Sequence, residues 1–82
     1  MNTYSTLDAL VPGERAVVER LYTAPSMRRR FQDIGLCENT SVECVGKSPF
    51  GDPSAYLIRG AVIAIRVEDG GTVRIKEYQE AG

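Results

Sequence analysis

Three consecutive arginines, Arg28, Arg29 and Arg30, form the densest group of side chains in the sequence that could do chemistry. Guanidinium groups pair with carboxylates and phosphates, so the triplet could contact an acidic protein surface, lipid head groups or nucleotide phosphates. One arginine could also act as an arginine finger in GTP hydrolysis. The alternative is a solvated helix face whose arginine stems lie over apolar neighbours. Because arginines in a first helical turn oppose the helix dipole, we favour a use for at least one of them.

A second candidate group is the loop at residues 48–53, which two prolines bracket. Pro49 and Pro53 fix φ near both ends, and Gly51 is free to adopt a positive φ. Asp52 precedes a proline, which suits an Asx-type turn in which its carboxylate accepts from nearby backbone N–H groups. We therefore expect a rigid polar loop in which Asp52 has a structural role.

Aromatic residues near this loop suggest a binding groove. Phe50 stands at the loop tip and could line a shallow groove with Tyr22 and Tyr56, as in peptide-binding SH3 domains. In the alternative arrangement, Phe50 covers one end of the fold and both tyrosines are ordinary strand residues. From both candidate groups, the residues predicted to dock a partner are Arg28, Arg29, Arg30, Phe50, Asp52, Tyr22 and Tyr56.

The sequence predicts neither an enzyme nor a metal or cofactor site. It has no His, and its 2 Cys, Cys37 and Cys44, are too few for a four-ligand metal site. Asp52 has no partner base, and the sequence has neither a nucleophile–base pair nor a glycine-rich phosphate loop. We expect two reduced thiols, at least one of them in the core.

Length and composition predict a single small domain, residues 1–82, with one modest core. The formal net charge of −1 argues against a general nucleic-acid binder, which needs surplus lysine and arginine. No apolar run reaches the roughly 18 residues of a membrane span, and the first residues lack the pattern of a signal peptide. These features predict a cytoplasmic protein without membrane insertion.

The elements that must position these groups are short. Residues 6–10 read as one helical turn with Thr6 as its N-cap. Residues Arg15–Leu21 read as a strand, in which we expect Val17 and Leu21 to face inward and Val18 to be partly covered. A helix with Ser26 as N-cap then places Met27, Phe31 and Ile34 on one apolar stripe. The other helix residues face outward, and Gly35 stands where a C-terminal glycine belongs, followed by Leu36 as its hydrophobic contact.

The rest of the chain reads as β-structure. Residues 41–46 form a strand, with Val42 and Cys44 on one face, and a hairpin with a tight turn at Arg59-Gly60 follows the loop. Residues 68–71 read as a turn and residues 72–78 as the last strand. The sum predicts a mainly β fold: a small SH3-like antiparallel barrel of about five strands, with one short α-helix between the first two. We expect barrel closure to remove exposed strand edges.

Three segments, in order along the chain, resemble the FeoA family, small cytosolic proteins of bacterial ferrous iron uptake. They are the LDALVPG opening, the RRFQDIGL helix exit and the PFGDP loop, whose following hairpin ends in AIR. The chain departs from the family pattern at Glu38-Asn39, where Pro-Gly is common, and in the turn at residues 68–71. Both departures lie in turns.

The resemblance implies a non-enzymatic accessory protein that docks on the cytoplasmic GTPase part of the FeoB permease. It would then be peripheral to the inner face of the cell membrane through its partner, and a weak homo-oligomer stays open. GTPase activation has been suggested for the family by analogy with SH3-mediated regulation. Two alternatives remain: an SH3-like nucleic-acid-binding module, and an SH3-like regulatory domain of the type found in metal-dependent repressors.

Overall fold

The computed structural model describes residues 5–78, so the predicted domain of residues 1–82 extends past it at both ends. Its elements, in chain order, are β1 (Ser5–Thr6), the 3-10 helix η1 (Leu7–Ala9), β2 (Arg15–Leu21), α1 (Pro25–Asp33), β3 (Ser41–Lys47), β4 (Ser54–Ile58), β5 (Ala61–Ile65), α2 (Val67–Gly70) and β6 (Val73–Glu77). The mainly β prediction is confirmed, and β1 adds a two-residue strand to the expected five. No described helix is long and apolar enough to cross a membrane.

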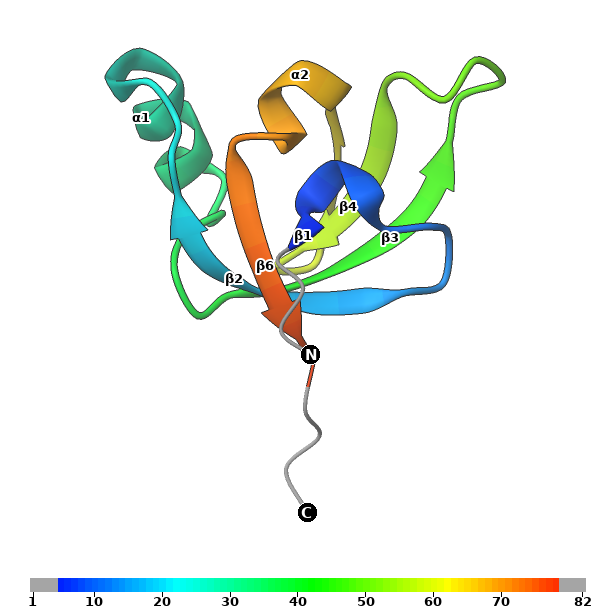
Figure 1. Ribbon diagram of the computed structural model, residues 1–82, viewed down its shortest axis with the longest axis horizontal. Coiled ribbons are helices and arrows are strands. Elements are labelled where there is room, and N and C mark those ends of the chain that lie inside the picture. Colours follow the sequence, from blue (N-terminus) through cyan, green and yellow to red (C-terminus); the bar gives the residue numbers. More distant parts are fainter. Residues whose placement is uncertain (1–4, 79–82) are drawn as a thin grey trace.

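All six described strands form one antiparallel sheet in the order β1-β6-β2-β3-β4-β5. The sheet bends around a single core, with α1 between β2 and β3 in the chain, as predicted (Figure 1). However, β1 and β5 stand at the two ends of the strand order, so hydrogen bonds do not close the sheet within the described residues. The expectation that closure removes every strand edge is therefore wrong.

The inward face of β2 differs from the prediction. Val18 is fully buried and Leu21 nearly so, whereas Val17 is only half-buried. Strict alternation cannot place positions 18 and 21 on one face, but a bulge shifts the pairing with β6 between Val18 and Arg20. The extra residue, Glu19, resets the alternation.

Among residues 5–78, the core comprises 14 buried residues drawn from nearly every element: Leu7, Leu10, Ala16, Val18, Leu21, Phe31, Leu36, Val42, Cys44, Tyr56, Ile58, Ile65, Val73 and Ile75. Met27, Ile34 and Ile63 are partly buried against it. The predicted apolar stripe of α1 and the inward positions of β3 are thus confirmed. No single element could bury its apolar face alone, because each is only a few residues long.

The start of α1 also differs from the prediction. Its N-cap is Ala24, which forms no side-chain cap, and Pro25 occupies the first turn. Proline suits this place because its φ is already helical and its missing N–H would have no partner there. Ser26 is therefore inside the helix rather than its cap.

The end of α1 is as predicted. Gly35 has φ 87°, and its N–H donates to the carbonyl of Gln32 at 3.0 Å. The Leu36 N–H donates to Phe31 at 2.8 Å, and both of these side chains are buried in the core. This pair of bonds is the Schellman motif with its hydrophobic contact.

The helical turn predicted at residues 6–10 is present as η1. Thr6 precedes it, but its hydroxyl donates to the carboxylate of Asp8 rather than capping the backbone. The turn predicted at residues 68–71 overlaps the short helix α2, in which the amides of Asp69 and Gly70 both donate to the carbonyl of Arg66.

Candidate docking surface

All three arginines of the triplet in α1 are exposed, but Arg28 also makes a contact within the fold. Its Nη2 donates to the carbonyl of Leu21 at 2.6 Å. Arg28 thereby ties the first turn of α1 to the end of β2 and provides a backbone carbonyl with a charged donor. Arg28 therefore combines exposure with a structural contact, whereas Arg29 and Arg30 are exposed on the helix surface.

Phe50 is the most exposed large apolar side chain of the described residues, at 97%. The loop that carries it is fixed internally, because the Gly51 N–H donates to Ser48 at 2.8 Å and the Ser48 N–H donates to Pro53 at 3.1 Å. Gly51 has φ 82°, a conformation that favours glycine. Phe50 therefore does not cover the end of the barrel, and the loop holds its ring in solvent.

Asp52 has a structural role, but over a longer range than the sequence indicated. Its Oδ1 accepts the backbone N–H of Val67 at 2.9 Å, 15 positions along the chain. Val67 is the first residue of α2. Asp52 therefore acts as an N-cap supplied by another element, and it connects the Phe50 loop to α2.

Tyr56 cannot line a surface groove, because it is 1% exposed. Its hydroxyl donates to the carbonyl of Leu7 at 3.2 Å, and burial raises the pKa of its phenol. Tyr22 is 59% exposed, and its hydroxyl accepts from Nη1 of Arg74 at 2.9 Å. The three aromatics therefore do not form the predicted groove, and Tyr56 belongs to the core.

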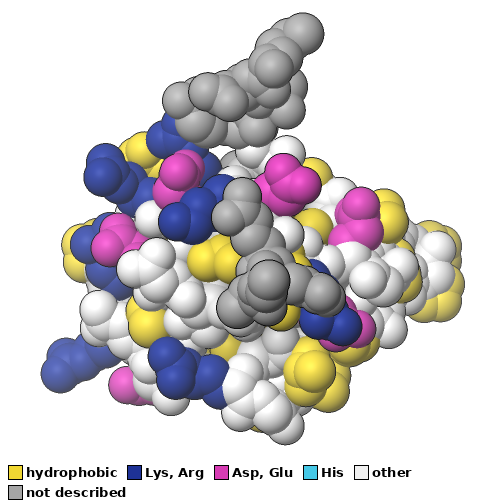
Figure 2. Space-filling view, turned by 90° about the horizontal axis from the view of Figure 1, so that it is seen from below, with side chains coloured by type: hydrophobic (Ala, Val, Ile, Leu, Met, Phe, Trp, Pro, Cys, Tyr) yellow, Lys and Arg dark blue, Asp and Glu magenta, His cyan; other side chains and the backbone are white. Residues whose placement is uncertain are grey.

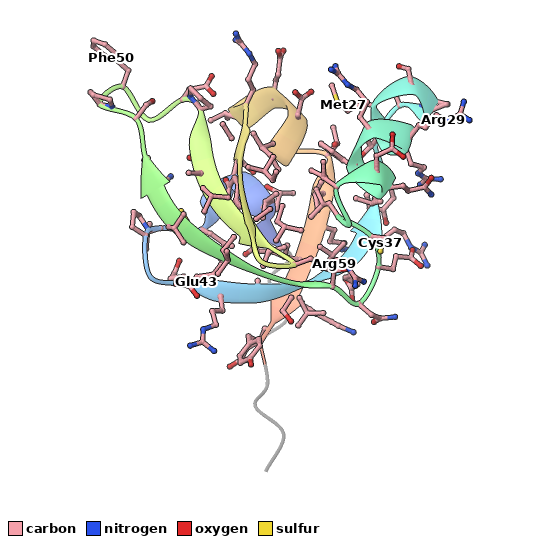
Figure 3. All side chains as sticks on the ribbon, turned by 180° about the vertical axis from the view of Figure 1, so that it is seen from behind. Met27, Arg29, Cys37, Glu43, Phe50 and Arg59 are labelled. Atoms are coloured by element: carbon pink, nitrogen blue, oxygen red, sulfur yellow. The ribbon has the colours of Figure 1, made fainter. Side chains whose placement is uncertain are left out.

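The exposed candidates lie at one end of the molecule. Figure 1 shows α1, α2 and the loop at residues 48–53 at the end opposite the C-terminal end of β6, with α2 in the middle. In Figure 3, Arg29 and Phe50 stand at opposite sides of this end. The opposite end, in Figure 2, carries interspersed basic and acidic side chains. A partner that contacted both Arg29 and Phe50 would have to span the whole upper end.

A shallow hollow of about 410 Å³ lies beside α1. Its lining combines one face of the helix with the loop that follows it: Leu21, Arg28, Gln32, Cys37, Glu38 and Asn39. Sequence reasoning missed this hollow. Asn39 has φ 70°, in the left-handed region, which asparagine adopts more readily than most residues.

The two cysteines lie apart in the fold. Cys44 is fully buried in β3, and Cys37 is half-buried, with its Sγ 3.3 Å from Oγ1 of Thr40. Within residues 5–78, no three His, Cys, Asp or Glu side chains gather where they could hold a metal ion.

Arg59 links the β4–β5 hairpin to the end of α1. Arg59 and Gly60 have φ 49° and 85°, as a two-residue type I′ turn requires. The Arg59 Nε donates to the carbonyl of Gly35 at 3.3 Å, and a Cβ at Gly35 would collide with Cδ of Arg59. Gly35 is thus required both for its conformation and for this close approach.

A family model for the FeoA domain matches residues 5–77. No curated protein sequence matches the chain. A solved FeoA-like protein from Clostridium acetobutylicum has a TM-score of 0.83 and 23% identity, with 100% of this chain and 95% of that chain covered. The FeoA of Stenotrophomonas maltophilia, solved with zinc, has a TM-score of 0.77 and 25% identity, with 88% and 89% covered. It is described as an SH3 domain protein, which agrees with the predicted architecture.

The same fold occurs in part of a larger protein. A manganese-dependent transcriptional repressor has a TM-score of 0.82 and 18% identity over 95% of this chain. The match covers 44% of the repressor. At this identity the similarity shows a shared fold.

Proposed function

This chain belongs to the FeoA domain family, and from that membership we propose that it is a non-enzymatic accessory protein of ferrous iron uptake. It acts by docking on the cytosolic GTPase part of a FeoB-type ferrous iron permease. The protein is cytoplasmic and reaches the inner face of the cell membrane through this partner. Residues 1–82 act as one domain. The relative from Stenotrophomonas maltophilia supports the process, because its description raises a role as a ferrous iron transport activating factor.

One observation carries the docking proposal: Phe50 is 97% exposed on a loop that is hydrogen-bonded at both ends. Exposed aromatic rings are favoured anchors in protein interfaces, because they bury a large area with few rotatable bonds. A rigid loop adds little ordering cost when a partner binds. Phe50 is the anchor, and Arg29 and Arg30 supply a positive face for acidic side chains of the partner.

The test is a titration of the full chain against the cytosolic domain of the permease, with GTP analogue, GDP or no nucleotide, at physiological salt. We expect Phe50→Ala to weaken binding at least tenfold, the range of an interface anchor. Its matched control is Val62→Ala, which truncates another exposed apolar side chain, 62% exposed, on β5. Both variants should keep the wild-type circular dichroism spectrum.

The arginine contribution has a separate test in the same titration. Arg29→Glu/Arg30→Glu should weaken binding and reduce its dependence on salt, because it removes positive charge from α1. Lys76→Glu, an exposed charge reversal on β6 at the other end of the molecule, should leave binding unchanged. Wild-type affinity in Phe50→Ala and in the arginine variant would contradict this docking surface.

Nucleotide dependence would separate two modes of action. Binding that differs between the GTP and GDP states would mean that the protein reads the switch of its partner. Equal binding in every state would make it a scaffold, because a ligand with equal affinity for two states shifts neither.

The repressor similarity supports a second candidate function, a regulatory domain of a metal-dependent repressor. In that function the domain would contact the other domains of its own repressor rather than a permease. Absence of binding to the permease domain, with binding to such a repressor, would favour this candidate.

A further inference from the structure

Strand β5 is an unprotected sheet edge. It is the last strand in the sheet order and pairs only with β4 within residues 5–78. Its sequence, AVIAI, contains no charge, proline or bulge, the usual devices that block pairing with another chain. The other edge strand, β1, has only two residues. β5 is thus the longer of the two edges that the described sheet offers to a further strand.

The hairpin turn decides which backbone groups of β5 face outward. In a two-residue type I′ hairpin, the residues that flank the turn, here Ile58 and Ala61, are a hydrogen-bonded pair. Hydrogen-bonded pairs alternate along the ladder, so Val62 and Ala64 direct their N–H and C=O groups away from β4. Val62 is 62% exposed and Ala64 is also exposed, so these groups lie at an open edge.

The outer face next to this edge is also apolar. Val62 lies across from Leu57, and Ala64 across from Ala55. Leu57 and Ala55 are half-buried, and no charged side chain stands on either pair. A strand added to β5 would extend an apolar surface rather than desolvate a charge.

We propose that a second copy of this chain occupies the edge, with β5 paired antiparallel to β5 across a two-fold axis at Ile63. In this register the outward-facing backbone N–H and C=O groups of the two strands meet, and all five residues of each strand are paired. Val62 of each copy then forms a hydrogen-bonded pair with Ala64 of the other, which gives four backbone hydrogen bonds. The axis makes the contact self-complementary, as a two-fold interface requires.

The charges at the ends of β5 fit this register. Beyond the ends of β5, the same two-fold axis brings the turn at Arg59 of one copy toward the start of α2 in the other, where Glu68 and Asp69 stand in the first turn. Arg66 lies opposite Gly60, so no arginine faces another arginine. Figure 3 shows Arg59 at the turn of the hairpin, where its Nε donates to the carbonyl of Gly35 in its own chain. The antiparallel arrangement thus places basic residues of one copy near acidic residues of the other.

The dimer is weak, because a five-residue strand buries less surface than a standard interface. We expect a dissociation constant between roughly 0.1 and 1 mM, typical of a small transient contact. Sedimentation equilibrium of the full chain, without any partner, from micromolar to millimolar concentration should show a monomer–dimer equilibrium. If the chain stayed purely monomeric at 1 mM, the proposal would be overturned. A strand of another protein would then be the candidate occupant of the β5 edge.

Two variants test the pairing itself. Ala64→Pro removes the outward N–H but no bond to β4, and should weaken the dimer about tenfold or more, because two hydrogen bonds per dimer are lost. Its control, Ala64→Ser, keeps the N–H and should dimerise as the wild type does. Equal dimerisation of a folded Ala64→Pro would overturn the proposal.

A charge pair tests the register without proline. Val62→Lys and Ala64→Glu should each dimerise more weakly alone, because each buries an unpaired charge. Mixed together they should associate several-fold more tightly than either alone, because position 62 of one copy lies directly opposite position 64 of the other. A mixture that associates no better than its components would overturn this register.

Discussion

At the scale of single residues, Phe50 and Tyr56 show how differently the fold uses two aromatic rings six positions apart. Phe50 is 97% exposed on a fixed loop, and Tyr56 is 1% exposed in β4. Tyr56 also donates its hydroxyl to Leu7, so one side chain fills the core and binds the backbone of η1. A buried phenol must stay neutral, because burial penalises its charged form.

This gives Tyr56 a pH-dependent contribution to stability. Burial raises the pKa of the folded phenol above its ordinary value of about 10, so the unfolded chain releases this proton first. The free energy of unfolding should therefore be unaffected by this group below pH 10 and should fall as the pH rises above it. Urea unfolding followed by circular dichroism between pH 7 and pH 11 measures this alkaline loss.

The matched variant for this prediction is Tyr56→Phe. It should be less stable at neutral pH by about 0.5–1.5 kcal/mol, because the bond to Leu7 is lost. Its alkaline loss should be smaller than that of the wild type, because the buried ionisable group is gone. Parallel losses in both proteins would show that other groups cause the alkaline decline.

At the scale of elements, the short helices depend on contacts supplied by other parts of the chain. α1 has no side-chain N-cap, but Arg28 fastens its first turn to β2 and Gly35 closes its end against Arg59. α2 is only four residues long and receives its cap from Asp52. A helix of one turn is not stable alone, because nucleation fixes more dihedral angles than its bonds offset. These contacts therefore decide where the helices form.

Removal of the cap on α2 should be measurable. Asp52→Ala should lower the free energy of unfolding by about 0.5–2 kcal/mol, the usual range for the loss of an N-cap. Asp52→Asn keeps an oxygen acceptor for the Val67 N–H and should lose less. Urea unfolding at pH 7 compares the three proteins, and equal stability of Asp52→Ala and the wild type would contradict a capping role.

At the scale of the whole molecule, one core joins nearly every element, from Leu7 in η1 to Ile75 in β6. We therefore expect residues 1–82 to unfold as a single cooperative unit. The chain has no Trp and 4 Tyr, so tyrosine fluorescence reports tertiary structure and far-ultraviolet circular dichroism reports the sheet. Their urea transitions should coincide, and separated midpoints would indicate two independent units.

The sequence alone determined the longer elements and the family, because these depend on local patterns, but it missed β1 and gave α2 as a turn. The stripe of Met27, Phe31 and Ile34, the glycine at position 35 and the Arg59-Gly60 turn each specify their conformation within a few residues. The order of these segments also indicated the bent β-sheet. The residues proposed to dock the partner, Phe50, Arg29 and Arg30, were recognised in the same way.

Only the tertiary structure decided what lies inside and which distant groups meet. The bulge at Glu19 moved Val17 off the core face, and the curl of the sheet buried Tyr56. Asp52 caps α2 rather than its own loop. Such outcomes depend on strand register and on contacts between segments far apart in the chain. Alternative registers and contacts differ little in free energy, so local sequence patterns do not decide between them. The open edge at β5 has the same origin, because closure depends on the whole sheet rather than on any one strand.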